Sequence, residues 1–446
     1  MLAPIVKALD ESILADFSLT PPLFDRLIAA QRQLGLVFGD RPTCRFLRPH
    51  LVSRSQYDEI ARAAQTIATA FEKLVTAALI DEELLNSLGL TEMERKMARI
   101  DPGYSRLCVS SRLDAHVSES GFEFLEYNAE TPAGVSDQML LEKVLFGLSH
   151  VKELLERNPH WRPEPHTRLL SALLDAYRDW GGEKERPQIA IVDWKGVATE
   201  SEFRVLQEYF IGQRYETVIA DPRDLSYDGQ HLAAGDFRID ILYKRVIIHE
   251  FLERCGDDHP LARAYADGRL CMANSFRTKI AHKKAALAIL RDPQYDHLFT
   301  SDEIEMFRRH IPWTRRMEPG VTTFHDREES LIPLVRRERN RFVLKPNDDY
   351  GGHGVFLGWE SSENDREQAI ESALKRPYVV QERAALGKTS IPTFSDRVQL
   401  EEMYVDFNPF LFHNEVEGAL IRLSSSSLLN VTSGGGQTAL LVLENF

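Results

Sequence analysis

The stretch that decides the fold is FEFLEYNAETP, at residues 122–132. Its apolar and polar residues alternate, which predicts a strand that points Glu126 and Asn128 to the same face. A carboxylate and an amide oxygen side by side are hard ligands that suit Mg²⁺. Glu130 continues the alternation, although Thr131-Pro132 is expected to end the strand. The alternative is a solvated sheet face, because exposed strands routinely carry polar residues.

A second strand is predicted just before this one, within residues 104–121, with a polar turn at Ser118–Gly121. Arg112 and Asp114 share one face of that strand. If the two strands pair, these side chains converge with the acid and the amide of the next strand. The sequence therefore predicts a metal site with a cation beside it.

A lysine and a glycine-rich loop stand in FVLKPNDDYGGHGV, at residues 342–355. Lys345 ends a predicted strand, and Gly351, Gly352 and Gly354 follow before the next strand of a hairpin. An ammonium beside backbone N–H groups that glycine leaves open to close approach suits a polyphosphate. The loop is not the G-x-x-x-x-G-K-[ST] phosphate motif. A hairpin whose glycines only supply positive φ is the alternative.

Polar residues also mark the later strands. Gln381 and Glu382 close the apolar run YVVQE, where backbone and carboxylate can read an adenine edge. Alternatively, the strand simply reaches water there. Asp406 and Asn408 repeat the acid–x–Asn spacing, and Arg422 lies on a following strand.

For the rest of the chain the sequence predicts secondary structure that supports the site. Residues 187–270 alternate strand, helix and strand, which indicates a parallel, doubly wound subdomain. No G-x-G-x-x-G opens its first helix, so a dinucleotide site is not indicated. Residues 1–100 show helical spacing with Ser55 as a candidate N-cap, and a helical cap or dimer surface is the default interpretation. Residues 278–290, TKIAHKKAALAIL, are also predicted to be helical.

Composition excludes several classes of protein. The chain has 446 residues, 43% hydrophobic and 27% charged, which predicts two or three packed globular lobes. A net charge of −14 without a long basic block argues against duplex nucleic acid as a partner. The four cysteines form no C-x-x-C pair, the acidic start does not fit a signal peptide, and no apolar run could span a membrane. We therefore expect a cytoplasmic protein without a membrane partner.

Taken together, these segments resemble the ATP-grasp superfamily. The likeness is carried by VLKPNDDYGGHGV, VVQE, VDFNPFLF, IRLS and NVTSGGG. In most ATP-grasp enzymes the acidic strand follows the lysine and the glycine loop, whereas here RLD and FLEYNAETP come far earlier. This order resembles the circularly permuted ATP-grasp proteins, including the synthetase domain of glutathionylspermidine synthetase.

The resemblance implies an α/β fold class in which permuted, α+β ATP-grasp lobes carry a Rossmann-like subdomain and an N-terminal helical region. The expected divisions are 1–100 (helical), 101–150 (metal-ligand strands), 165–270 (Rossmann-like) and 271–446 (ATP-grasp lobes with the glycine loop). The implied catalytic residues are Arg112, Lys345 and Arg422; the implied Mg²⁺ ligands are Asp114, Glu126 and Asn128; and the implied ATP-binding residues are Lys284, Lys345, Gly351, Gly352, Gly354, Gln381 and Glu382. Lys283 is the alternative to Lys284, and Asp406 and Asn408 are expected only to support the site.

The activity that the resemblance implies is ATP- and Mg²⁺-dependent ligation of a carboxylate to an amine, on small molecules or peptides, through an acyl phosphate. An ATP-grasp kinase and a non-catalytic nucleotide-binding protein are the alternatives, because a fold does not determine a function. The amidase domain of the bifunctional relative has no counterpart in residues 1–100, and Cys44 lacks a histidine partner pattern. Glutathione and spermidine are therefore not carried over as substrates.

Overall fold

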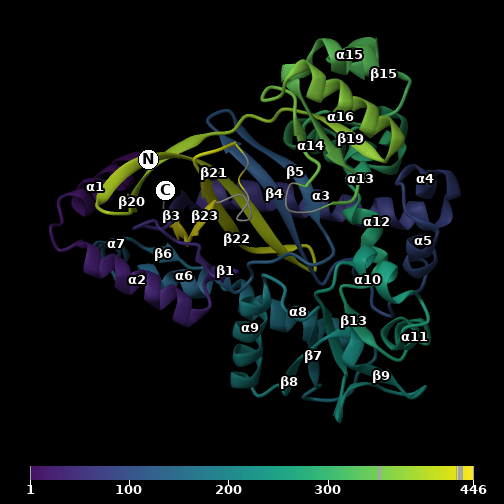
Figure 1. Cartoon of the computed structure of the whole chain (residues 1–446), viewed down its shortest axis with the longest axis horizontal. Coiled ribbons are helices and arrows are strands. Elements are labelled where there is room, and N and C mark those ends of the chain that lie inside the picture. The colour runs from purple at the N-terminus through teal and green to yellow at the C-terminus, as the bar shows by residue number, and fades with distance from the viewer. Residues whose placement is uncertain (1, 350–352, 428, 430–434, 445–446) are drawn as a thin grey trace.

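A six-stranded antiparallel sheet, here called the central sheet, runs through the middle of the molecule (Figure 1). The computed structural model describes residues 2–349, 353–427, 429 and 435–444. The sheet joins segments that lie far apart in the sequence. Its strands are β4 (Ser110–Ser118), β5 (Gly121–Asn128), β20 (Lys388–Phe394), β21 (Val398–Phe412), β22 (Glu415–Ser424) and β23 (Gly436–Thr438).

The pairing of β4 with β5 confirms the predicted hairpin. The two strands run antiparallel, and Arg112 lies opposite Asn128 while Asp114 lies opposite Glu126. β21 pairs with both β4 and β22, and it places Asp406 opposite Arg422. The charged positions of four strands therefore meet on one face of the central sheet.

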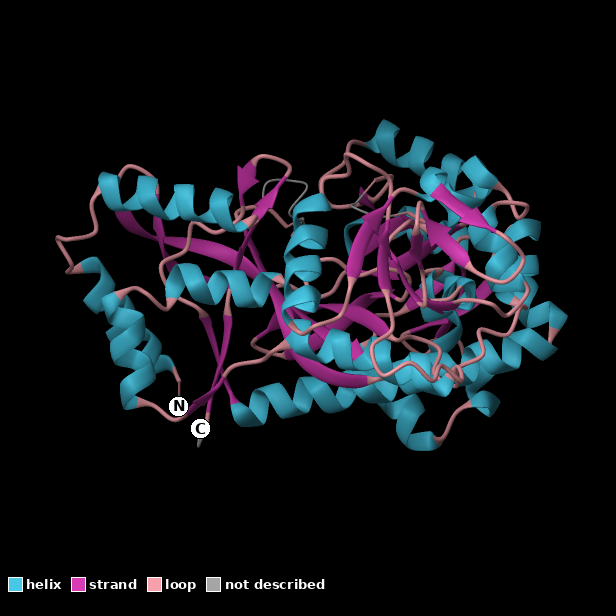
Figure 2. Cartoon of the chain, turned by 90° about the horizontal axis from the view of Figure 1, so that it is seen from below, coloured by secondary structure: helices cyan, strands magenta, loops and turns pink. Residues whose placement is uncertain are grey.

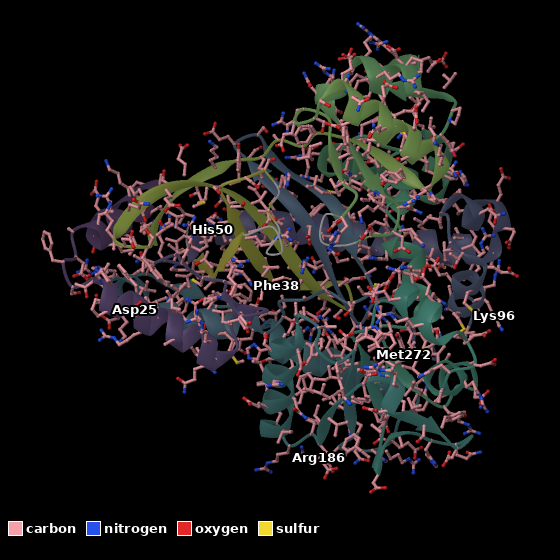
Figure 3. The ribbon with its side chains drawn as sticks, viewed as in Figure 1. Asp25, Phe38, His50, Lys96, Arg186 and Met272 are labelled. Atoms are coloured by element: carbon pink, nitrogen blue, oxygen red, sulfur yellow. The ribbon has the colours of Figure 1, made fainter. Side chains whose placement is uncertain are left out.

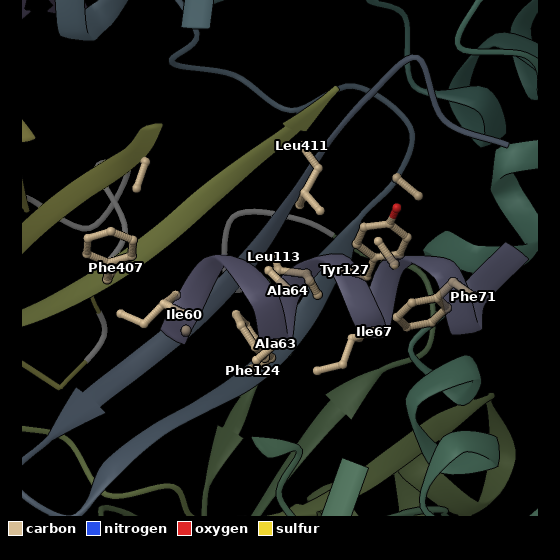
Figure 4. Packing of buried hydrophobic residues seen from close by; sticks show 14 of the residues in the cluster. Ile60, Ala63, Ala64, Ile67, Phe71, Leu113, Phe124, Tyr127, Phe407 and Leu411 are labelled. Carbon is tan, nitrogen blue, oxygen red and sulfur yellow. The ribbon is translucent and has the colours of Figure 1, made fainter. Parts of the chain in front are cut away.

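The other face of the central sheet is covered by the long helix α3 (Arg54–Ile80). Ile67 and Phe71 of this helix pack with Leu113 and Tyr127 of the strands (Figure 4). The rings of Phe71 and Tyr127 stack with their centroids 4.4 Å apart. Because successive side chains on a strand point to opposite faces, an apolar underside leaves the polar residues on the open side.

The start of α3 differs from the prediction of Ser55 as its cap. Ser53 has the extended backbone of an N-cap, and its hydroxyl accepts a hydrogen bond from the backbone N–H of Gln56. The Gln56 side chain in turn accepts from the backbone N–H of Ser53. This reciprocal capping box outcompetes Ser55, which lies inside the helix.

The predicted parallel sheet is present as β7 (Ile189–Val192), β8 (Thr217–Ala220), β12 (Ile241–Lys244) and β13 (Cys271–Ala273). All its pairs are parallel, in the order β13-β12-β7-β8. Helices lie on both sides of these strands (Figure 2): α8 (Pro165–Asp179) and α9 (Glu200–Gly212) on one face, α10 (Ile248–Cys255) and α11 (Pro260–Ala266) on the other. We call this part the Rossmann-like subdomain. A small antiparallel sheet extends it, formed by β9 (Leu225–Tyr227), β10 (Leu232–Ala234) and β11 (Phe237–Arg238).

A third part, here called the glycine-loop lobe, stands at the upper right of Figure 1. Its antiparallel sheet has the order β14-β19-β17-β18, and the pairing of β17 with β18 confirms the predicted hairpin. Its core joins aromatic residues such as Trp313 and Phe342 to Ile370 of α16. The elements are β14 (Thr314–Arg316), β15 (Val321–Phe324), β16 (Arg327–Ser330), α15 (Leu331–Arg337), β17 (Phe342–Pro346), β18 (Phe356–Leu357), α16 (Glu363–Lys375) and β19 (Tyr378–Glu382).

The N-terminal region is helical, as predicted, but it also contains strands. β3 (His50–Ser53) pairs in parallel with β24 (Leu440–Leu443), which also pairs with β6 (His160–Trp161). A four-residue strand is too short to show a period, and its partner lies at the opposite end of the chain. The other elements of this region are α1 (Ala3–Leu14), α2 (Pro21–Leu34), β1 (Val37–Phe38), β2 (Arg41–Pro42), α4 (Glu82–Ser87) and α5 (Glu92–Ala98). Two further helices, α6 (Asp137–Leu145) and α7 (Ser149–Arg157), follow β5 in the chain. Among the described helices, none has the length and apolarity needed to cross a bilayer.

Candidate active site

A cavity of about 600 Å³ lies where the central sheet, the Rossmann-like subdomain and the glycine-loop lobe meet. Phe38, labelled near the centre of Figure 3, lines it from the N-terminal region. Most of the predicted site residues line this one cavity: Arg112, Asp114, Glu126, Asn128, Lys284, Lys345, Gln381, Glu382 and Arg422.

Asp114 accepts four hydrogen bonds within the described residues. Arg112 donates to it twice, from Nε to Oδ1 at 2.6 Å and from Nη2 to Oδ2 at 3.1 Å. Asn128 donates from Nδ2 to the same carboxylate at 3.1 Å. Burial alone raises the pKa of Asp114, but Arg112 and Arg422 outweigh it and hold the pKa at about 2. Asp114 is therefore a permanent anion at neutral pH.

Arg422 links two acids across the sheet. Its Nη2 donates to Asp114 Oδ2 at 2.9 Å and to Asp406 Oδ2 at 2.5 Å. Asn408 donates from Nδ2 to Asp406 Oδ1 at 2.7 Å. Burial raises the pKa of Asp406 to about 6 against the opposing influence of Arg422. Asp406 and Asn408 thus hold the guanidinium in place, which fits the supporting role expected for them.

Two lysines reach the cavity from different elements. Lys345 Nζ donates to Gln381 Oε1 at 2.7 Å, and Lys284 Nζ lies 3.6 Å from Glu126 Oε2. Burial lowers the pKa of Lys345 to about 8, although Glu126 acts in the opposite direction. Lys283 instead contacts Glu94 outside the cavity lining, so the geometry favours Lys284 of the two predicted alternatives.

The predicted helix at residues 278–290 is two helices, α12 (Lys279–His282) and α13 (Ala285–Leu290). Asn347, which follows β17, enters the break between them. Its backbone oxygen accepts from Lys284 N at 3.0 Å, and its Oδ1 accepts from Ala285 N at 2.8 Å. Because these bonds replace those of a continuous helix, the break directs Lys284 into the cavity.

The glycine loop is described only in part, since the predicted ATP contacts Gly351 and Gly352 lie outside the described residues. Gly354 has φ +66°, and an added Cβ would lie 2.7 Å from Pro346 Cγ. Both the backbone conformation and the space therefore require glycine at this position. Gly354 itself does not line the cavity, although its neighbours His353 and Val355 do.

The two residues predicted at adenine have partners within the chain. Gln381 donates from Nε2 to Thr314 Oγ1 at 3.0 Å, in addition to its bond with Lys345. Glu382 lies 2.7 Å from Arg341 Nη2 and 3.0 Å from His325 Nε2. Their side chains thus support neighbouring groups, and the backbone N–H of Glu382 itself donates to Trp313 O at 2.7 Å.

The oxygen donors suit a hard divalent cation. Glu126 supplies a carboxylate, and the amide oxygen of Asn128 accepts no hydrogen bond within the described part of the chain. Asp114 stands beside them, but both its oxygens accept from arginines. The residues present fit Mg²⁺, with Glu126 and Asn128 presenting the most accessible oxygens.

A second group of side chains is also a candidate metal site. Oxygens of Glu130 and Asp348 and a ring nitrogen of His282 lie within 4.8 Å of one another. Lys279 Nζ, however, lies 2.7 Å from Glu130 and 2.7 Å from Asp348. An ammonium ion already neutralises these carboxylates, which leaves a metal little reason to bind. Glu130 lines the same cavity as Glu126 and Asn128, but its carboxylate is paired with Lys279.

Sequence reasoning missed several charged residues that line the same cavity, among them Asp137, Asp193, Glu202 and Arg245. Asp193 follows β7 directly and Arg245 follows β12. Those two strands were predicted, and ligands of doubly wound sheets bind at the carboxyl ends of such strands. That rule could have identified both residues.

The fold and the cavity between its lobes define an ATP-grasp protein. The family model described as circularly permuted ATP-grasp type 2 matches residues 49–424, and the chain belongs to that family. The permuted order that the sequence predicted is thereby confirmed.

Several known proteins are similar to the chain. An uncharacterized protein of Mycobacterium leprae is 23% identical over 437 residues, covering 91% of this chain and 73% of that protein. An uncharacterized protein of Synechocystis is 23% identical and covers 72% of this chain and 66% of that protein. The structure of a glutathione synthetase-like effector from Globodera pallida in its apo form has a TM-score of 0.60 at 13% identity, covering 94% and 96% of the two chains. That likeness shows the fold.

Proposed function

We propose that the chain is an ATP- and Mg²⁺-dependent ligase that joins a carboxylate to an amine. The observation that carries the proposal is the meeting of Lys284, Lys345, Arg112 and Arg422 with Glu126 in one cavity between lobes. Four cationic side chains can bind the negative phosphates of a nucleotide, and the carboxylate can bind the metal ion that accompanies them. The ATP-grasp family to which the chain belongs supports ATP as that nucleotide.

The lysines are proposed to bind the phosphates. Lys345 of β17 is held by Gln381, and Lys284, which lies between α12 and α13, is held by the backbone oxygen of Asp349. Neither lysine is tied to a carboxylate closer than the 3.6 Å between Lys284 and Glu126. Mg²⁺, held by Glu126 and Asn128 with Asp114 beside them, would neutralise the charge of the phosphates during transfer.

The arginines are proposed to act on the acceptor carboxylate. Arg112 and Arg422 converge on Asp114, and their guanidinium groups are fixed by bonds to Ala133 O and to Asp406. A guanidinium stabilises the negative charge of an acyl phosphate as the γ-phosphoryl group arrives. Because the chain supplies positioned charges and no covalent step of its own, the rate enhancement comes from orientation and electrostatics.

The test is a screen for ADP release. The chain is incubated with ATP, Mg²⁺ and single amino acids or small di- and tricarboxylic acids, first alone and then with an amine. A ligase forms hydroxamate when hydroxylamine is added, because hydroxylamine captures an acyl phosphate. ADP release that needs neither hydroxylamine nor an amine indicates the kinase alternative, and tight ATP binding without turnover indicates the non-catalytic one.

Matched variants connect the activity to the site. Glu126→Ala removes the proposed metal contact, and Glu402→Ala removes an exposed acid of β21 that lies outside the cavity. We expect the first to lower turnover by at least ~100-fold, the size found when a preorganised charge contact is lost. The second is expected to retain wild-type turnover. Near wild-type ADP release by Glu126→Ala would contradict the proposal.

A further inference from the structure

Asp137 is a carboxylate of the cavity that has no cation of its own. Asp137 begins α6, lines the cavity and has Gln437 of β23 as its hydrogen-bond partner. Within the described residues it forms no ion pair. Five other cavity acids do: Asp114 with Arg112, Asp406 with Arg422, Glu126 with Lys284, Glu382 with Arg341, and Glu202 with Arg245. Asp193, which lines the cavity farther into the Rossmann-like subdomain, resembles Asp137 in forming no ion pair among the described residues.

The segment before Asp137 is held from both sides. Arg112 donates from Nη1 to Ala133 O at 2.8 Å, while Glu202 Oε1 accepts from Gly134 N at 2.9 Å and Val135 N at 2.8 Å. The same arginine that contacts Asp114 therefore fixes the turn that leads to Asp137. A rigid backbone places this unpaired carboxylate beside the site proposed for the acyl phosphate.

Beyond Asp137 the cavity continues into the Rossmann-like subdomain. Asp193 and Arg245 follow β7 and β12, the neighbouring strands at which the order of this parallel sheet reverses. Such a reversal opens a crevice in which ligands bind. Arg245 is buried, and its Nε has no hydrogen-bond partner among the described residues. The crevice therefore keeps a buried N–H donor, at Arg245, that has no partner among the described residues.

We propose that this crevice is the acceptor subsite, that it takes a primary amine as its ammonium ion, and that Asp137 accepts the proton which the amine must lose. The inference rests on the proposed ligase function. An alkyl ammonium has a pKa of about 10, so at neutral pH it has no lone pair with which to attack.

The proposed step balances in atoms and charge. The ammonium gives one proton to the Asp137 carboxylate, and the nitrogen lone pair then forms the C–N bond with the acyl carbon. The C–O bond to phosphate breaks, and its electron pair leaves with the phosphate. The nitrogen loses its second proton to the departing phosphate, and Asp137 returns its proton to water. The products are an amide, hydrogen phosphate and one released proton.

The surroundings of Asp137 suit a base that works near neutral pH. Burial and then Glu202 of α9 raise the pKa of Asp137 to about 7, while Arg112 of β4 acts in the opposite direction. The remaining neighbour, Gln437, carries no charge. A base with a pKa close to the working pH combines ionisation with useful basicity.

The test compares two acceptors on Asp137→Asn, using an acid identified by ADP release. Hydroxylamine is largely neutral at pH 7 and needs no base, whereas a primary alkyl amine does. We expect amide formation with the alkyl amine to fall at least ~100-fold, while hydroxamate formation stays within about threefold of wild type. Asp236→Asn, an exposed acid in the turn between β10 and β11, is the matched control and should leave both unchanged.

Two results would overturn the inference. Equal loss with both acceptors would place Asp137 in acyl-phosphate formation or in folding, and equal retention would show that it takes no proton. If wild type releases no ADP with any acid, the ligase proposal fails instead, and a binding measurement then decides on the subsite alone.

That binding measurement is thermal unfolding at pH 8 with methylammonium chloride, compared with sodium chloride at equal concentration. Methylammonium should raise the Tm of wild type and of Asp236→Asn but not that of Asp137→Asn, because the proposed subsite places the ammonium against the Asp137 carboxylate. Identical shifts in all three proteins, or none in wild type, would contradict an ammonium subsite at Asp137.

Discussion

The structure contains two networks of buried charges: one is paired internally, and the other lies in the cavity on the open face of the central sheet. The sealed cluster, formed by Glu94, Glu130, Lys279, Lys283 and Asp348, lies between α5, β5, α12 and the start of the glycine loop, and Glu130 is its one member that lines the cavity. The cavity network, formed by Arg112, Asp114, Glu126, Asp406 and Arg422, lies on the open face of the central sheet. Each acid of the sealed cluster has a lysine nitrogen within 2.9 Å.

The comparison shows that buried charge does not by itself identify a site. In the cavity network Glu126 is 33% exposed, and its nearest lysine is 3.6 Å away. Lys279 in the sealed cluster is 0% exposed and touches two acids. In the cavity network, Glu126 can still bind a ligand. In the sealed cluster, the lysines are already paired with acids, and these pairs hold Asp348 beside the glycine loop.

The largest expected effect is on the stability of the sealed cluster. Lys279→Met leaves Glu130 and Asp348 buried without their shared cation, which is expected to lower the free energy of unfolding by about 3–5 kcal/mol. Denaturant unfolding measures it. Lys184→Met removes an exposed lysine paired with Asp240 and should cost less than about 1 kcal/mol. A similar small loss for Lys279→Met would mean that the cluster does not stabilise the fold.

The cavity network should show the opposite pattern. Lys345→Ala is expected to lower ADP release by at least ~100-fold while changing the unfolding free energy less than Lys279→Met does, because Lys345 has neutral partners. Steady-state turnover and denaturant unfolding are measured on the same preparations. Lys388→Ala, an exposed lysine of β20, should match wild type in both. If Lys345→Ala lowered the free energy of unfolding as much as Lys279→Met does but kept wild-type turnover, the distinction between the networks would be contradicted.

A smaller effect is expected where the sealed cluster meets the glycine loop. Gly354→Ala combines a left-handed backbone with a 2.7 Å contact to Pro346, so we expect ATP to bind roughly tenfold more weakly, or about 1.4 kcal/mol. Calorimetric titration with ATP measures this. Gly235→Ala has a similar φ of +59° with no atom within 4 Å of the added Cβ, and it should not change ATP affinity. Equal affinities of the two variants would remove the loop from the binding site.

The smallest effect concerns pH. Burial raises the pKa of Asp193 to about 6, so the folded state binds more protons than the unfolded state between about pH 4 and 6. Stability should therefore fall as the pH rises through that range. Asp193→Asn is expected to flatten this decline, which melting curves from pH 4 to 8 would show. Asp348 has the opposite sign, since Lys279 and Lys283 hold its pKa well below the usual range, and its contribution is lost only as the pH falls below about 4.

Local pattern was enough to predict the strands that carry the cavity network. Alternation in residues 104–132 placed Arg112, Asp114, Glu126 and Asn128 on one face, and the register of β4 with β5 confirms it. The apolar positions between them pack on α3, which is why the alternation was so regular. Residues two apart on a strand point to the same face of the sheet, so their spacing in the sequence is enough to predict which side chains lie together.

Contacts between distant segments could not be predicted in this way. The pairing of β3 with β24 and the entry of Asn347 between α12 and α13 both depend on partners far along the chain. The same holds for Asp137, whose place in the cavity depends on bonds from Arg112 and Glu202 to the turn before it. No local period marks such a residue, because its position results from tertiary packing.

The most direct test of the account is ATP binding measured by calorimetry with and without Mg²⁺, on wild type and on Glu126→Ala. The cavity network predicts that Mg²⁺ strengthens binding to wild type and that the substitution removes most of this gain, while Lys284 and Lys345 still bind the nucleotide weakly. The same Mg²⁺ dependence in both proteins, or no ATP binding in either, would contradict a metal–nucleotide site at β4 and β5.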